Sequence, residues 1–173
     1  MKTTLSCETP FPNLLLYGMH KLQVINRTTV PNDVVRALVR FTRPPGIKRF
    51  RVELSNSSYL WHGHGSSRGI RVYINTKAKY PRRYQPYQYG QLKARWTKAD
   101  PVTGVIRQLK GRRYYLSSVT EAMIFLFAHE LMHTRQGQKG AMRGRVWGAR
   151  GRYSEIETET WAIKKLREYR RSV

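Results

Sequence analysis

The segment that most constrains the fold is a helix that is apolar on every side and ends in two histidines. Residues 122–128 read Ala-Met-Ile-Phe-Leu-Phe-Ala, and a run without a polar face is typical of a helix in the core of a domain. Residues 118–121, Ser-Val-Thr-Glu, have the spacing of a capping box, so we expect the helix to start there. It should run to about Gln136, with Gly137 ending it. Other elements must therefore surround this helix.

The flanking segments predict an α+β domain. Residues 31–42 carry apolar side chains at helical spacing, and Pro44-Pro45-Gly46 ends that helix. Alternating apolar and polar residues predict strands at 50–54 and 70–74, with weaker signals at 59–64 and from Tyr114. A last helix is expected from about Ser154 toward Tyr169. The order of elements is that of an α+β domain.

We expect a single domain over residues 1–173. A small, mostly antiparallel sheet would pack on the central histidine-bearing helix, with a second helix at the C-terminal end. Residues 75–112 form a long basic and aromatic excursion, and residues 137–152 form a loop rich in Gly and Arg.

The central helix carries the residues of a hydrolytic metal site. His129 and His133 are four residues apart, so both imidazoles project from one face and can bind one tetrahedral ion. Glu130 lies about 100° around the helix from His129, close enough to hold a metal-bound water. The metal lowers the pKa of that water toward ~7, and the carboxylate takes its proton as the water attacks a carbonyl. The alternative is that both histidines lie at an exposed, frayed helix end and bind no metal.

A zinc ion held by two histidines needs a third protein ligand and an open position for water. Three acids at the start of the last helix are candidates: Glu155, Glu157 and Glu159. Glu155 and Glu159 project within the apolar arc of that helix, whereas Glu157 projects toward solvent. We therefore favour Glu155 over Glu157, which follows Ser154 by three residues as a capping-box acid does. Glu159, one turn later, would accept the N–H of a zinc-bound histidine.

These two motifs resemble those of the gluzincin zinc metallopeptidases. That family has HExxH followed by ExxxD, and here His129-Glu130-x-x-His133 is followed by Glu155-x-x-x-Glu159. Residues 155–162 look like the E-x-E-A-[ND]-x-F-A segment of small bacterial and phage members, except that Glu159 replaces Asp or Asn and Thr158 replaces Ala. The resemblance covers residues 118–166. It implies a minimal zincin-like domain that hydrolyses peptide or protein substrates, with one zinc ion on the two histidines and Glu155, and with Glu130 as general base.

The resemblance also implies a substrate-binding strand. In zincins, an edge strand ahead of the active-site helix binds the substrate backbone by strand addition. The order of elements makes Ile70 to Ile74 our candidate for that edge. His62 and His64 share one strand face and either line the cleft or lie on the surface. An oxyanion-stabilising tyrosine or arginine is expected near the zinc, and the available tyrosines are Tyr114, Tyr115 and Tyr153.

The charge of the chain favours a polyanionic partner. Thirty-three Lys and Arg against ten Asp and Glu give a net charge of +23, and such a surface attracts phosphate polymers. Cations interleaved with aromatic rings are typical of single-strand binding, and the candidate contacts here are Arg82, Arg83, Tyr84, Arg95, Trp96, Arg143 and Arg145. The alternative is a loop whose tyrosines pack onto the core. A second hypothesis follows, in which the protein binds nucleic acid and its zinc site is structural or degenerate.

The sequence also predicts a compartment. Its one cysteine, Cys7, excludes an intramolecular disulfide and suits a reducing cytosol. The longest apolar run, 122–128, is far shorter than the ~20 residues of a membrane helix. Residues 14–17 are too few for a signal peptide. We therefore expect a cytoplasmic protein with no membrane contact.

Overall fold

The computed structural model describes residues 22–58, 61–84, 114–140 and 155–173. The elements follow in the order β1 (Gln23–Arg27), α1 (Asn32–Thr42), β2 (Arg51–Asn56), β3 (Trp61–Ser66), β4 (Gly69–Ile74), β5 (Arg82–Tyr84), β6 (Tyr114–Leu116), α4 (Val119–Gln138) and α5 (Glu155–Arg170). The expected α+β class is confirmed, and α1, α4 and α5 all lie where the sequence predicted helices.

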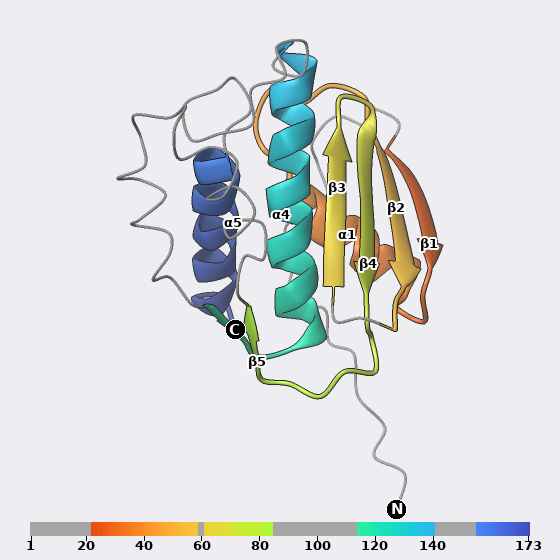
Figure 1. Ribbon diagram of the computed structural model, residues 1–173, viewed down its shortest axis with the longest axis vertical. Coiled ribbons are helices and arrows are strands. Elements are labelled where there is room, and N and C mark those ends of the chain that lie inside the picture. The colour runs from red at the N-terminus through yellow and green to blue at the C-terminus, as the bar shows by residue number, and fades with distance from the viewer. Residues whose placement is uncertain (1–21, 59–60, 85–113, 141–154) are drawn as a thin grey trace, which may run out of the picture.

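The main sheet has four strands in the order β1-β2-β4-β3 (Figure 1). β1 and β4 pair with β2 in parallel, and only β3 pairs with β4 antiparallel. The sheet is therefore mixed, and the prediction of a mostly antiparallel sheet is wrong. α1 carries the chain back so that β2 runs in the same direction as β1, a strand that was not predicted from the sequence. β4 lies between β2 and β3 and also runs in the same direction as β2. β5 and β6 form a separate antiparallel pair.

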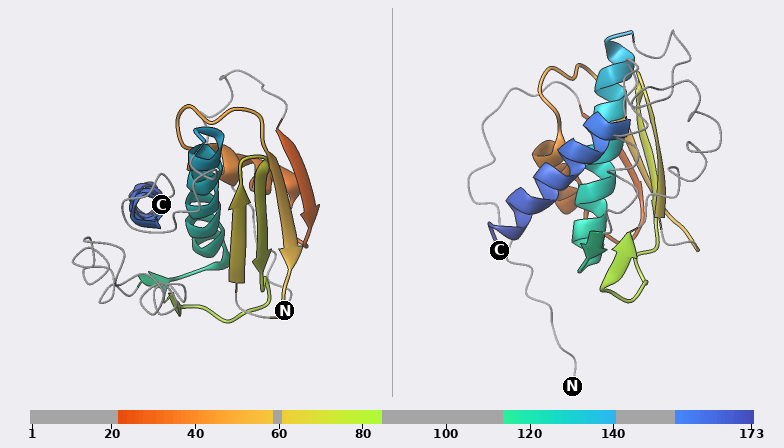
Figure 2. Two further views of the ribbon diagram at one scale, coloured as in Figure 1. Left: turned by 45° about the horizontal axis from the view of Figure 1, so that its top comes forward. Right: turned by 60° about the vertical axis from the view of Figure 1, so that its left-hand side comes forward.

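The core lies on one face of this sheet. Val52 and Leu54 of β2 and Ile70, Val72 and Ile74 of β4 point inward and are buried, as their alternation predicted. α1, α4 and α5 lie on this face (Figure 2). α4 packs directly against β3 and β4, and α5 packs against α4 and α1. α4 is thus the central element, as expected.

The two ends of α4 follow from its sequence. Ser118 is the N-cap, and its Oγ accepts a hydrogen bond from the Glu121 N–H at 3.2 Å. The Glu121 carboxylate in turn accepts the Ser117 N–H at 2.7 Å. The predicted end is wrong by two residues: Gly137 lies within the helix, and the chain leaves it at Gly140, whose φ of 83° favours glycine. No helix in the described ranges combines the length and apolar character that crossing a membrane requires.

An ion pair fixes the C-terminal end of α5 to the first turn of α4. Arg170 donates to both carboxylate oxygens of Glu121, at 2.8 and 2.7 Å. Burial opposes ionisation of this carboxyl, but the hydrogen bonds and charge of Arg170 and the Ser117 N–H outweigh burial, so the pKa of Glu121 is lowered below its usual 4.5. The two helices therefore run antiparallel, and the first turn of α5 lies beside the last turns of α4.

Candidate metal centre

His129 and His133 face each other in the buried part of α4. His129 is 6% exposed and His133 is 3% exposed, so the pair does not lie at a frayed, exposed helix end. The two Nε2 atoms are 3.2 Å apart, and the ring planes meet at 81°. Two imidazole nitrogens on one tetrahedral zinc, each at 2.0–2.1 Å, would be about 3.3–3.4 Å apart. The spacing of the pair is therefore close to that of two ligands on one ion.

Hydrogen bonds orient the His133 ring. The Gln136 Nε2 donates to the Glu157 carboxylate at 2.8 Å, and an ionised carboxylate can only accept. The Gln136 Oε1 must therefore be the atom 3.1 Å from His133 Nδ1, and this oxygen requires a proton on Nδ1. In the neutral ring the lone pair is then on Nε2, directed at His129.

A carboxylate stands beside the other histidine. Glu159 of α5 is 1% exposed, and its Oε2 lies 3.8 Å from His129 Nδ1. This distance is in the ion-pair range but longer than a hydrogen bond. A carboxylate on that side favours the proton on Nδ1 and the lone pair on Nε2. Glu159 therefore lies beside His129, but at this distance it does not accept the predicted hydrogen bond from the ring.

Glu130 lies between α4 and the edge strand β3. It is 5% exposed, and a Cβ added to Gly63 would lie 2.5 Å from its Oε1. A Cβ added to Gly65 would lie 2.6 Å from the Glu130 backbone oxygen and 2.7 Å from His133 Cβ. β3 can therefore approach Glu130 and His133 this closely only because Gly63 and Gly65 carry no side chains. The sequence analysis missed these glycines, although their alternation with histidines in residues 61–66 was the available signal.

Glu155, the predicted third ligand, is the first residue of α5, and its side chain lies outside the described part of the structure. Glu157, the rejected candidate, is 47% exposed and pairs with Arg135 at 3.1 Å, so it projects toward solvent as expected. Among the described side chains, no three His, Cys, Asp or Glu residues are grouped closely enough to hold a metal ion. The histidine pair is the part of the predicted ligand set that the structure describes.

The predicted cleft residues are not at the histidine pair. Ile70 to Ile74 lies in the interior strand β4, so its assignment as the edge is wrong, and β3 is the edge next to α4. His62 and His64 alternate with the inward glycines and are exposed on the outer face of the sheet, where His62 stacks on Tyr73 with ring centroids 4.4 Å apart. β3 is at the edge because its glycines bury little apolar surface, whereas Ile70, Val72 and Ile74 suit an interior strand.

None of the tyrosines predicted to stabilise an oxyanion is seen at the histidine pair within the described residues. Tyr115 is 61% exposed in β6, just before α4. His129 follows ten residues after the first residue of α4, a rise of about 15 Å, so Tyr115 is too far to stabilise an oxyanion there. The side chain of Tyr114 and all of Tyr153 lie outside the described residues.

The predicted nucleic-acid contacts fall largely outside the described ranges. Arg82, Arg83 and Tyr84 form β5, which pairs with β6, but their side chains are not described. The others, Arg95, Trp96, Arg143 and Arg145, lie wholly outside these ranges.

The contact of Gln136 with the His133 ring was not predicted from the sequence. We expect Gln136→Leu, which keeps the size of the side chain but removes the acceptor from His133 Nδ1, to weaken zinc binding about 10- to 100-fold. Titration against a chromogenic zinc chelator would measure this. The control is Gln138→Leu, two residues later, because the Gln138 side chain contacts loop backbone and no histidine. Equal zinc affinities of the two variants would contradict the assignment.

Comparison with known proteins adds no relative: no family model, curated protein or solved structure matches this chain. Any functional conclusion therefore rests on the geometry of the site.

Proposed function

We propose that this protein is a zinc-dependent metallopeptidase whose ion is bound by His129, His133 and Glu155. The observation that most supports the proposal is the pair of Nε2 atoms 3.2 Å apart, each on a ring whose Nδ1 faces an oxygen. Two facing lone pairs repel unless a positive charge lies between them, and buried polar groups need such compensation. A zinc ion supplies it with the nitrogen spacing observed. A shared proton would also supply it, and metal analysis distinguishes the two.

The residues of the chain fit a hydrolytic role for that ion. When bound, zinc supplies a Lewis acid and a water of lowered pKa. Glu130 is the residue next to His129 in the sequence, and its carboxylate is buried between α4 and β3. It would take the proton of the attacking water and return it to the leaving amine. Gln136 and Glu159 would keep the histidine nitrogens directed at the ion.

The edge strand supports a peptide as the substrate. β3 pairs with β4 and lies at the edge of the described four-stranded sheet, next to α4. An extended peptide binds to such an edge as an added strand. Because Gly63 lies against the Glu130 carboxylate, a peptide aligned on β3 would pass beside the general base.

The third ligand is tested by a matched pair of variants. We expect Glu155→Ala to remove most of the zinc from protein purified without added metal, because two imidazoles alone hold the ion weakly. Glu157→Ala should keep nearly one equivalent, because Glu157 contacts Arg135 and Gln136 rather than a histidine. Elemental analysis of the two variants and the parent measures this. The reverse ranking would overturn the choice of Glu155, and a metal-free parent would overturn the metal centre.

The second candidate function is a nucleic-acid-binding protein with a structural or degenerate zinc site. The net charge of +23 favours it. A structural site closes its fourth coordination position and needs no general base, so substitution of Glu130 separates the two candidates.

A further inference from the structure

Five cations from three segments gather near the C-terminal end of α4. Lys48 and Arg49 lie in the loop between α1 and β2, Arg68 lies in the turn between β3 and β4, and Lys139 follows α4; all four are exposed. Arg43, at the start of the loop, is half-buried. We call these five residues the basic corner.

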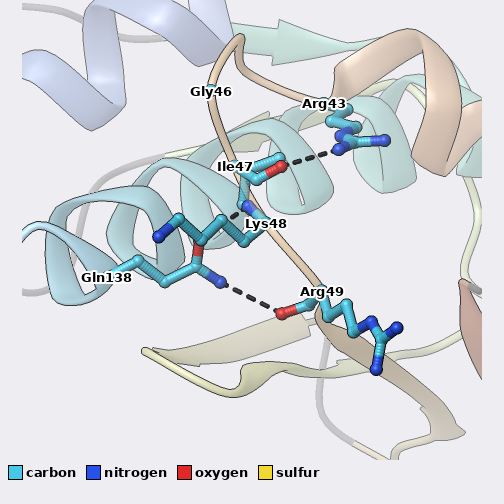
Figure 3. A pocket seen from close by; sticks show the side chains of 6 residues that line it. All are labelled: Arg43, Gly46, Ile47, Lys48, Arg49 and Gln138. Carbon is cyan, nitrogen blue, oxygen red and sulfur yellow. Dashed lines mark hydrogen bonds between the residues drawn. The ribbon is translucent and has the colours of Figure 1, made fainter. Parts of the chain in front are cut away.

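The side chain of Gln138, the last residue of α4, holds the basic corner together. Its Oε1 accepts the Lys48 backbone N–H at 2.7 Å. Its Nε2 donates to the backbone oxygens of Arg49 and Ser67, both at 3.1 Å. One amide therefore fixes the loop to the helix (Figure 3), and it fixes the turn through Ser67. Arg43 is fixed separately, because it donates to the Ile47 oxygen at 2.6 Å and lies over the Phe50 ring.

The positive charge of the basic corner is not neutralised by the described carboxylates, none of which lies within ion-pairing distance of Lys48, Arg49 or Arg68. The nearest acid in the sequence, Glu53, pairs instead with Arg51 and Arg71, at 2.8 and 3.2 Å. Cations held close together without acids repel one another, so binding of an anion there would stabilise the folded state.

The arrangement suits a polymer of phosphates better than one small anion. Arg43, Lys48 and Arg49 line an open depression of about 720 Å³ with Gly46, Ile47 and Gln138, far larger than one phosphate group. Figure 3 shows the cationic ends of these three side chains directed to different sides of the loop rather than to a common point. Spaced cations of this kind contact successive phosphates along a backbone.

We propose that the basic corner binds the phosphodiester backbone of a nucleic acid. An anionic membrane would also present phosphates, but stable attachment to it needs a second signal besides charge, such as apolar side chains that insert between lipids. Within the described ranges the exposed large hydrophobic residues are Tyr115 and Val173, and neither belongs to the corner. Contact with the backbone alone reads no sequence.

The test compares two double variants with equal net charge. Lys48→Gln/Arg49→Gln removes two cations of the corner, and Arg167→Gln/Arg171→Gln removes two exposed cations near the end of α5. The second pair lies beside the first turn of α4, because the neighbouring Arg170 binds Glu121. α4 has 20 residues, or about 30 Å, so the two sites are at opposite ends of the helix. The probe is a short DNA duplex of mixed sequence, and its affinity is measured by fluorescence anisotropy over a series of NaCl concentrations.

Each phosphate contact contributes about 0.9 to the slope of log affinity against log salt. We expect the corner variant to lose about 1.8 from the magnitude of that slope, while the α5 variant keeps the parent slope. Equal losses in the two variants would show that only net charge matters, and an unchanged corner variant would show that this surface does not contact DNA. Preferential loss of binding to phosphatidylserine vesicles, with duplex binding unchanged, would identify a membrane instead. Each of these outcomes overturns the proposal, and none depends on the metal centre.

Discussion

Replacement of Glu130 by glutamine is expected to lower kcat for peptide hydrolysis about 100- to 10,000-fold while zinc stays bound. Glutamine keeps the shape of the side chain, so it still fits between α4 and Gly63. It cannot take a proton from the attacking water, and that transfer is the role assigned to the carboxylate. The proposed ligands His129, His133 and Glu155 are unchanged, so the ion should remain.

Hydrolysis of a quenched peptide library and elemental analysis of the same samples measure the two quantities. The matched control is Glu168→Gln on α5, which also removes one carboxylate, but one that pairs with Lys165 on the surface. A Glu130→Gln variant as active as the parent would show that the mechanism is wrong. If the unsubstituted protein binds duplex DNA but cleaves no peptide, the result favours the nucleic-acid-binding protein with a structural or degenerate zinc site.

Alanine at Gly65 is expected to destabilise the protein by about 1–3 kcal/mol or more, because it overpacks a rigid contact. The added Cβ would meet the backbone oxygen of Glu130 at 2.6 Å and His133 Cβ at 2.7 Å. Neither atom can rotate away, since both belong to the buried middle of α4. β3 must therefore move off the helix, and the contacts between them are lost.

Alanine at Gly63 is the matched comparison. Here the added Cβ meets only the side chain of Glu130, at 2.5 to 2.7 Å, which can rotate away. We expect Gly63→Ala to lose less stability than Gly65→Ala but more activity, because the general base is displaced. Urea unfolding and peptide hydrolysis of both variants measure this. Equal stability of the two variants would contradict the close approach of β3 to α4.

The helices and the histidine pair could be predicted from the sequence because the signals are local. Residues 122–128 are apolar throughout, and α4 is buried from Glu121 to Thr134. Ser118 caps the helix as its spacing indicated. Glu159 was predicted to face inward from the apolar arc of α5, and it is 1% exposed beside His129.

The order of strands could not be predicted in the same way, because it depends on pairing between distant segments. The residues of β1, Gln-Val-Ile-Asn-Arg, alternate too weakly to indicate a strand, yet β1 pairs with β2 as a parallel neighbour. The role of Gln136 depends on Glu157, which is 21 residues away on another helix. The need for glycine at positions 63 and 65 follows only from the contact of β3 with α4, which the sequence does not indicate.

The glycines that allow β3 to approach α4 closely also lower the stability of β3 itself. A glycine loses more backbone freedom on folding than any other residue and adds no side chain to the packing. β3 has two glycines at inward positions, so its order depends on its contacts with β4 and α4. A change that loosens β4 or α4 is therefore expected to disorder β3 first, and with it the cover that β3 provides over Glu130 and His133.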